Sequence, residues 1–182
     1  DLANTLQRPN GTHLFGTDDL GRDVFSRIIY GTRTSLTIGV ASIFIALLFG
    51  GLLGITAGYF KGKVDAIIMR VCDVLLSIPS TLLAIAIVAS LGNGINNLIL
   101  AISIANIPIF ARIIRSSVLS VNEKQFIEAS NALGATNFRI IFRHVIPNVI
   151  SPIIVQSTMG VATAILSAAG LGFIGLGVEP AV

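Results

Sequence analysis

The sequence predicts an all-α fold, a polytopic bundle of membrane-spanning helices. Composition is the first observation behind this prediction. Of the 182 residues, 53% are hydrophobic and 12% are charged, whereas a typical soluble domain has about 25% charged residues. The mean hydropathy is +0.87. The second observation is that three stretches of at least 27 residues contain no charge. A helix needs about 20 apolar residues to cross a bilayer.

The charge-free stretches place the membrane segments. Residues 34–60 are long enough to cross once. Residues 74–111 are too long for one crossing, and the turn-forming string LGNGINN at 91–97 divides them into two helices. Residues 145–178 begin with prolines and end in a glycine cluster, which predicts one long helix with a broken exit. Together these stretches predict four membrane helices.

The basic residues predict the orientation of the helices. Eight of the twelve lysines and arginines lie near residues 61–70 and within residues 112–143. By the positive-inside rule both of these regions are cytoplasmic. Residues 1–33 then form an extracytoplasmic tail, although its four arginines count against this side. The remainder, residues 34–182, forms the transmembrane domain.

The tail has two features of its own. Asp23–Tyr30 is amphipathic, which predicts a short helix lying in the outer interface before the first crossing. His13, Asp18, Asp19 and Asp23 match no spacing of a known metal-ligand motif, so no metal site is expected there.

A polar loop at residues 122–147 separates two long apolar segments, and it has an internal pattern. A helical run over Asn122–Leu133 stops at Gly134, a residue suited to the left-handed conformation at a helix end. Thr136 or Asn137 then caps a second run from Phe138 to Val145, and Pro147 closes the unit and starts the next segment. The pattern predicts a short helix-turn-helix outside the membrane, where it meets a partner.

The same loop carries a family resemblance. The order Glu-Ala, four residues, Gly, nine residues and then His-x-x-Pro resembles the EAA loop of bacterial ABC importer permeases. The family's third motif position is usually Ala and is Ser130 in this chain. The matching residues are Glu128, Ala129, Gly134, His144 and Pro147.

Two further stretches extend the resemblance over nearly the whole chain. The string GTDDLGRD at 16–23 is similar to that of the dipeptide/oligopeptide/nickel subfamily, and GLGFIGLGVEP at 170–180 resembles the ending of its members. The resemblance implies a MetI-like permease fold. It also implies one more membrane helix on each side, so that the four helices belong to a six-helix subunit.

The resemblance also implies a function and a set of partners. The chain is expected to be the permease subunit of an importer in the cytoplasmic membrane of a bacterium or archaeon. It would move peptides or a related small solute, such as a nickel chelate, by alternating access. The expected partners are cytoplasmic ATPase subunits, a second and different homologous permease chain, an extracytoplasmic substrate-binding protein and lipid.

No enzymatic activity is expected of the chain itself. Its Gly-Lys string, GYFKGK at 58–63, lacks the spacing of a phosphate-binding loop, so ATP and Mg²⁺ are expected on the partner ATPases. Nucleic acid is not an expected partner, because no basic stripe with interleaved aromatic residues is present.

The loop residues have expected roles in docking to the ATPase. Glu128 anchors the contact through its charge or by capping, and Gly134 permits the turn. Phe138 and its neighbours either fill the partner's groove or pack against this chain's own helices. The predicted docking residues are Glu128, Ala129, Ser130, Gly134, Ala135, Phe138, Ile141, Phe142, His144 and Pro147.

Small residues recur every four positions on two of the expected helices, a spacing that lets helices approach closely in lipid. They form either an interface with another subunit or gate, or ordinary packing within the chain. These residues are Gly50, Gly54, Gly58, Gly160, Ala164 and Ala168.

Other residues are expected to shape the interior. Pro79 and Pro108 lie inside expected helices, which they should kink. Asp73 and Arg112 bound the second apolar stretch and either reach the interface or pair with each other near a gate. Deeper polar side chains either line a polar pathway or bond to their own helix backbone. These are Ser103, Asn106, Gln156, Ser157, Thr158, Thr163 and Ser167.

The competing class is a secondary transporter or channel subunit. Such a protein needs inverted repeats or a coupling-ion site, and the sequence shows neither. A membrane enzyme is disfavoured, since the chain has two histidines and no nucleophile motif.

Overall fold

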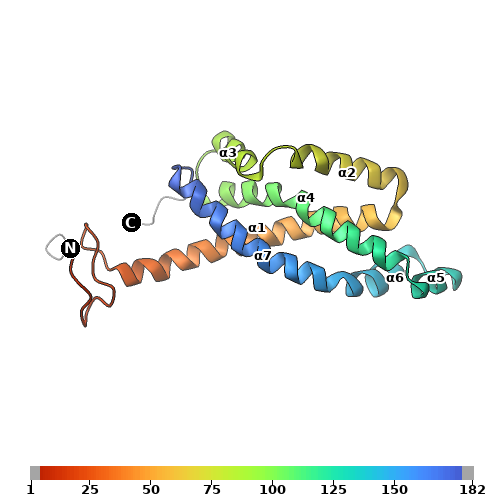
Figure 1. Cartoon of the computed structure of the whole chain (residues 1–182), viewed down its shortest axis with the longest axis horizontal. Coiled ribbons are helices and arrows are strands. Elements are labelled where there is room, and N and C mark those ends of the chain that lie inside the picture. Colours follow the sequence, from red (N-terminus) through yellow and green to blue (C-terminus); the bar gives the residue numbers. More distant parts are fainter. Residues whose placement is uncertain (1–4, 178–182) are drawn as a thin grey trace. The chain divides into compact units, whose positions relative to one another are not determined.

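The computed structural model describes residues 5–177, and it confirms the all-helical fold class (Figure 1). The chain divides into two compact units at the boundary between Thr37 and Ile38. The helices are α1 Val24–Phe60, α2 Gly62–Leu76, α3 Ser80–Leu91, α4 Ile95–Asn122, α5 Gln125–Ala132, α6 Asn137–Ile140, the π-helical turn η2 Ile141–Val145 and α7 Ile146–Phe173.

The N-terminal unit is organised around the carboxylate of Asp18. It accepts hydrogen bonds from the backbone N–H groups of Leu20 and Arg22, both at 2.9 Å. It also accepts from Arg22 Nε at 3.0 Å and Arg27 Nη1 at 2.7 Å. Asp23 caps α1, because its Oδ2 accepts from the backbone N–H of Ser26 at 2.7 Å. The acidic residues of this tail therefore hold its backbone in place.

The prediction of a separate short helix over Asp23–Tyr30 is wrong. Helix α1 begins at Val24 and continues without a break to Phe60, over 37 residues. The physical reason is that no proline interrupts the stretch, and a single glycine such as Gly31 costs only about 1 kcal/mol in a helix.

Acid is expected to loosen the loop around Asp18. The backbone N–H of Arg22 is the largest cause that lowers the pKa of this carboxyl from 3.8 to about 2. Because the folded pKa is depressed, the stabilisation is present above pH 3.8 and is lost as the pH falls towards 2. Hydrogen-exchange protection of residues 18–23 should therefore fall between pH 5 and about pH 2.

The matched control for this prediction is Asp18→Asn, which should show low protection at both pH values. If residues 18–23 of the unsubstituted protein are as well protected from exchange at about pH 2 as at pH 5, Asp18 is not the group that organises this loop.

In the second unit, α1 approaches α4 closely along its glycine stripe. A Cβ added at Gly50 would lie 2.6 Å from the carbonyl oxygen of Ile107, and one at Gly54 would lie 2.6 Å from that of Ala111. At Gly58 it would lie 2.8 Å from the Cβ of Val118. These distances are shorter than any real contact, so glycine is what allows the two backbones to meet.

The second small-residue stripe also faces helices of this chain. A Cβ added at Gly160 of α7 would lie 3.1 Å from Ile43 Cδ1 on α1. Ala164 is buried, and Ala168 packs against the core. Of the two readings of the stripes, packing within the chain is thus the one that the contacts support.

Helix α4 is the centre of the second unit. It packs against α2, α3 and α7, and these helices lie around it in Figure 1. Its residues Leu98, Ile102, Phe110 and Ile114 are all at most 1% exposed. Pro108 lies inside α4 as predicted. The core of the bundle therefore runs along this helix.

The first of the two helices predicted within residues 74–111 has different bounds in the structure, where α3 covers only Ser80–Leu91. Pro79 does not lie inside a helix but precedes α3, at an 83° bend between α2 and α3. Helix α3 has 12 residues, a length of about 18 Å, which is too short to span a bilayer. The division at 91–97 is confirmed, since α3 ends at Leu91 and α4 begins at Ile95.

The predicted segment began at residue 74 because a charged residue was assumed to mark the end of a membrane helix. Helix α2 instead contains charged residues within its length. Asp73 pairs with Arg112 of α4 through a 2.6 Å contact, and Asp65 pairs with Arg115 through both carboxylate oxygens. Two ion pairs therefore hold a charged helix against the bundle. Asp73 and Arg112 therefore pair, as one of the two predicted alternatives has it, and both side chains remain more than half exposed.

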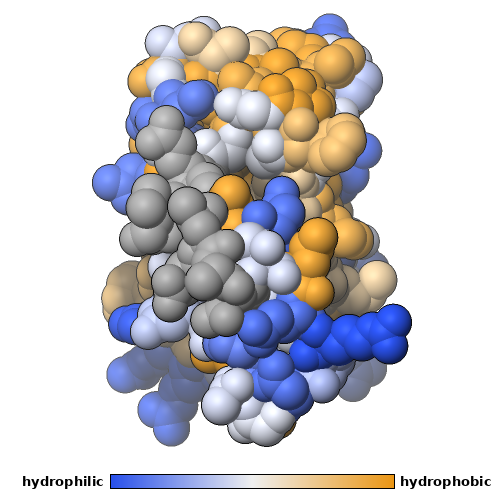
Figure 2. Space-filling model, turned by 90° about the vertical axis from the view of Figure 1, so that its left-hand side faces the viewer, coloured by the Kyte–Doolittle hydropathy of each residue, from blue (hydrophilic) through white to orange (hydrophobic). Residues whose placement is uncertain are grey.

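Among the described residues, three helices are long and apolar enough to cross a membrane, or four if the bent pair α2–α3 counts as one crossing. The second count equals the predicted four. Large apolar side chains on the outside of the bundle, such as Phe44 and Met159, are exposed. Figure 2 shows hydrophobic surface beside hydrophilic groups on one face of the molecule.

Candidate functional site

The first half of the polar loop folds largely as its residues predict. Helix α5 ends before Gly134, which adopts a φ of +77°. Of the two predicted caps, Thr136 is the one used, because its hydroxyl accepts from the backbone N–H of Arg139 at 3.4 Å. The first run begins at Gln125 rather than Asn122, since α4 continues to Asn122 and an extended Lys124 separates the two helices.

The second half of the loop differs from the prediction. Pro147 starts the next helix as predicted, since it lies at the beginning of α7. It does not separate this helix from the loop, because α6 continues through the π-helical turn η2 into α7. Pro147 lies in the first turn of α7, directly after the π-helical turn. The Asn148 side chain donates to the carbonyl oxygen of His144 at 2.7 Å. The loop is thus joined to the long helix α7 without a flexible break.

The aromatic residues of the loop are exposed. Phe138 is 71% exposed and Phe142 is 56% exposed, and their ring centroids lie 4.3 Å apart. Ile140 and Val145, on the other side of the same turns, are fully buried in the core. This arrangement excludes packing of Phe138 and Phe142 into this chain's own core and leaves them available to a partner.

The remaining predicted docking residues have mixed surroundings. Glu128 lies in the first turn of α5 and is exposed, and its carboxylate caps no backbone N–H among the described residues. Ala129, Gly134 and Pro147 are exposed as well. Half-buried positions are Ser130, Ala135, Ile141 and His144. The Phe126 and His144 rings lie 6.2 Å apart, so the histidine packs within the loop.

Two features of this surface were not predicted. Leu133, beside the turn, is 88% exposed. Arg139 and Arg143 are also exposed and lie on the same turns as the two phenylalanines. The surface therefore combines apolar groups with guanidinium groups and one carboxylate.

The loop is fastened to α1 by a hydrogen bond between distant residues. The Tyr59 hydroxyl donates to Asn137 Oδ1 at 3.0 Å. Close by in sequence, the Asn122 side chain donates to the carbonyl oxygen of Gly58, also at 3.0 Å. The end of α1 thus contacts both the end of α4 and the start of α6.

Removing the Tyr59 hydroxyl is expected to loosen the start of α6. Tyr59→Phe keeps the ring and loses one hydrogen bond, a contribution of about 1 kcal/mol. Hydrogen exchange over residues 134–138 should become about fivefold faster. Tyr30→Phe is the control, because Tyr30 is exposed and lies in the other unit. Unchanged exchange in Tyr59→Phe would mean that this contact does not hold the loop.

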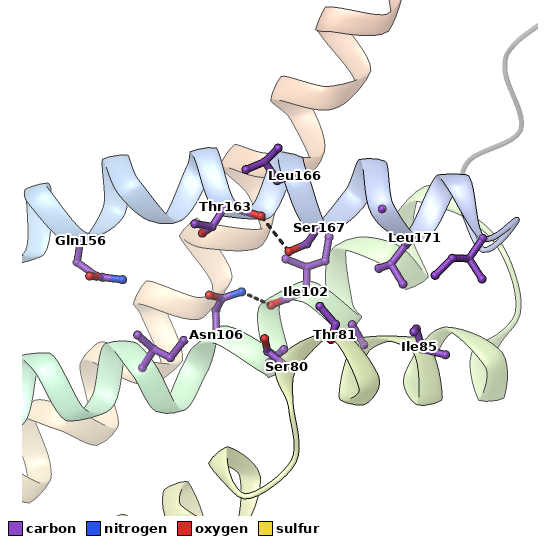
Figure 3. Close-up of a pocket in the computed structure, with 15 residues that line it drawn as sticks. Ser80, Thr81, Ile85, Ile102, Asn106, Gln156, Thr163, Leu166, Ser167 and Leu171 are labelled. Carbon is purple, nitrogen blue, oxygen red and sulfur yellow. Dashed lines mark hydrogen bonds between the residues drawn. The ribbon is translucent and has the colours of Figure 1, made fainter.

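A cavity of about 570 Å³ lies between α3, α4 and α7 (Figure 3). Of the predicted deeper polar residues, Asn106, Gln156, Thr163 and Ser167 line it. Ser103 is buried and bonds to the carbonyl oxygen of Ile99. Neither Ser157 nor Thr158 lines the cavity. Sequence reasoning missed Ser80 and Thr81, which line it from α3.

Comparison with known proteins identifies relatives over nearly the whole chain. The dipeptide transport system permease protein DppC of Alkalihalophilus pseudofirmus is 53% identical over 177 residues, which are 97% of this chain and 58% of that protein. The glutathione transport system permease protein GsiD of Pectobacterium atrosepticum is 45% identical over 99% of this chain and 60% of that protein. The chain therefore spans about 60% of the length of these relatives.

A solved structure shows the same fold. An inward-facing form of the MetNI methionine ABC transporter matches with a TM-score of 0.76 and 20% identity, over 85% of this chain and 77% of that chain. The family described as the inner membrane component of binding-protein-dependent transport systems matches residues 50–181. Because this match covers most of the sequence, the chain belongs to the family of binding-protein-dependent transport system inner membrane components.

Proposed function

We propose that the chain is part of a permease subunit in an ATP-driven importer of short peptides. Its loop at residues 122–147 faces the cytoplasm and docks on a separate ATPase subunit. The proposal assigns no ATP chemistry to this chain, so ATP and Mg²⁺ bind to the partner.

The observation that carries this proposal is the exposed aromatic pair of the loop. Phe138 and Phe142 contact each other outside the core with tilted rings, while Ile140 and Val145 anchor the same turns inside it. An amphipathic segment fixed on one side and apolar on the other suits insertion into a groove of a partner. Arg139 and Arg143 beside it would supply charge-assisted hydrogen bonds at the rim.

The connections of the loop explain how docking could drive transport. A movement imposed on α6 passes directly into α7, because η2 joins them without a loop. It also passes to α1 through the Tyr59–Asn137 hydrogen bond. Closure of two ATPase subunits would thereby move α7, which lines the cavity, and this movement would be the physical basis of alternating access.

Two kinds of relative support the solute class and the remaining partners. Relatives are named as dipeptide and glutathione permeases, which favours a short peptide over a nickel chelate. The family description names binding-protein-dependent systems. A substrate-binding protein on the outer side is therefore part of the proposal. A second, different permease chain is proposed from the resemblance of the polar loop alone.

The test is uptake of alanyl-alanine by the full-length complex in proteoliposomes, with its binding protein outside and ATP inside. Uptake should require hydrolysable ATP and should stop with a non-hydrolysable analogue. The competing class, a secondary transporter or channel, would give uptake without ATP, and that result would overturn the proposal.

A further inference from the structure

The cavity between α3, α4 and α7 has a lining of one chemical character. Its volume of about 570 Å³ lies within the range of about 300–1,000 Å³ of small-molecule sites. None of the described residues that line it is ionisable. Its polar groups are hydroxyls and carboxamides, and the rest of the wall is apolar. A solute with a net charge would find no counter-ion here, whereas a dipeptide is a zwitterion without net charge.

Two hydroxyl groups of the lining donate their protons to the backbone of their own helix. Ser167 donates its proton to the carbonyl oxygen of Thr163 at 2.9 Å. Thr163 donates its own to the carbonyl oxygen of Gly160, also at 2.9 Å. Since each hydroxyl has two lone pairs beside its single proton, these two groups remain acceptors for an N–H of a solute.

The carboxamides supply both donors and acceptors. Asn106 uses one N–H in a 2.8 Å bond to the carbonyl oxygen of Ile102, which leaves its oxygen and a second N–H. The Gln156 carboxamide makes no hydrogen bond with another residue of the described chain. In Figure 3, Gln156 extends from α7 towards α4, and Asn106 extends from α4 towards α7.

We propose that this cavity is a solute site in which the Gln156 and Asn106 carboxamides hydrogen-bond the main-chain amide of a short peptide. The inference rests on the proposed function, and it adds where and by what chemistry the solute is held. A carboxamide has the same donor and acceptor as a peptide group, so the two can pair. The apolar wall, which includes Ile85 and Leu171, would accept different peptide side chains without discriminating between them.

The test measures binding in the purified full-length complex, without the binding protein. A cysteine introduced by Ser167→Cys lies in the cavity wall, and its labelling by N-ethylmaleimide is compared with that of the parent. Alanyl-alanine should protect this cysteine. Its ester analogue alanyl-lactate, which lacks the peptide N–H, should need an about threefold to tenfold higher concentration, the effect of one hydrogen bond.

A second variant tests whether Gln156 hydrogen-bonds the peptide amide. Adding Gln156→Leu to Ser167→Cys should weaken protection by alanyl-alanine and reduce the difference between the two compounds, since one of the two carboxamides is lost. Thr158→Val is the control on the same helix, because Thr158 bonds to its own backbone and lies outside the cavity. Added to Ser167→Cys, this substitution should leave the ratio of the protecting concentrations of alanyl-lactate and alanyl-alanine unchanged. Co-purification with the ATPase subunits confirms that each variant is folded.

The outcomes separate this inference from the proposed function. Equal protection by the two compounds in Ser167→Cys alone, or no protection by either, would overturn the site while ATP-dependent uptake still held. Loss of discrimination in Thr158→Val would also overturn it. Uptake without ATP would overturn the proposed function regardless of any protection of the cysteine.

Discussion

A complex carrying Gly134→Val is expected to take up its solute at least about tenfold more slowly than the parent, because φ at this position is +77°. A left-handed conformation costs a residue with a Cβ about 1–2 kcal/mol, and a β-branched side chain is an outlier there. A loss of 1.4 kcal/mol is a factor of about ten. The turn would relax to another conformation and displace α6 from its docking position.

Space does not cause this effect, since an added Cβ at Gly134 meets no atom within 4 Å. Gly134→Asn is therefore the matched control, because asparagine tolerates the left-handed region. It should retain most of the uptake. Uptake and ATP hydrolysis are measured per assembled complex in proteoliposomes. A Val variant as active as the parent would show that this turn does not position the coupling surface.

Gly54→Ala is expected to destabilise the bundle strongly, whereas Gly51→Ala three residues earlier is not. A Cβ at Gly54 would lie 2.6 Å from the carbonyl oxygen of Ala111 and 3.0 Å from the Cβ of Ile114. Relief requires α1 and α4 to separate, and overpacking of this kind costs about 1–3 kcal/mol. The contact is between backbones, so no side chain can rotate away.

Gly51 provides the matched control on the same helix. Its added Cβ would lie 3.7 Å from Ile114 Cδ1, which is an ordinary contact. Removing a helical glycine gains about 1 kcal/mol, so Gly51→Ala should be neutral or stabilising. The measurement is the thermal unfolding midpoint of the complex in detergent. Equal midpoints for the two variants would contradict the close approach of α1 and α4.

The turn of the polar loop could be predicted because its signals are local. Gly134 and Thr136 are three residues or fewer from the helix ends that they define, and both act as expected. The glycine stripe was also recognisable, but its partner was not. Spacing shows that a helix approaches something closely, and only the fold shows that α4 of this chain is what Gly54 meets.

The features that escaped prediction depend on contacts between distant residues. Tyr59 and Asn137 are 78 positions apart and carry no motif that would link them. The α2–α3 bend was hidden because charges were taken as ends of membrane segments, while Asp65 is neutralised by Arg115. For Phe138, the amphipathic spacing allowed either contact with a partner or packing against this chain's own helices. The burial of Ile140 on the opposite side of the same turns shows that Phe138 faces away from the core.

The central claim is that the exposed face of the polar loop contacts an ATPase subunit. It is tested most directly by placing a photo-crosslinking amino acid at Phe138 in the full-length complex and identifying what it joins. The matched control is Phe44 of α1, which is 65% exposed on the bundle, close to the 71% of Phe138. The account predicts a crosslink to the ATPase subunit from position 138 and none from position 44. A crosslink from position 138 only to lipid or to the permease itself would contradict it.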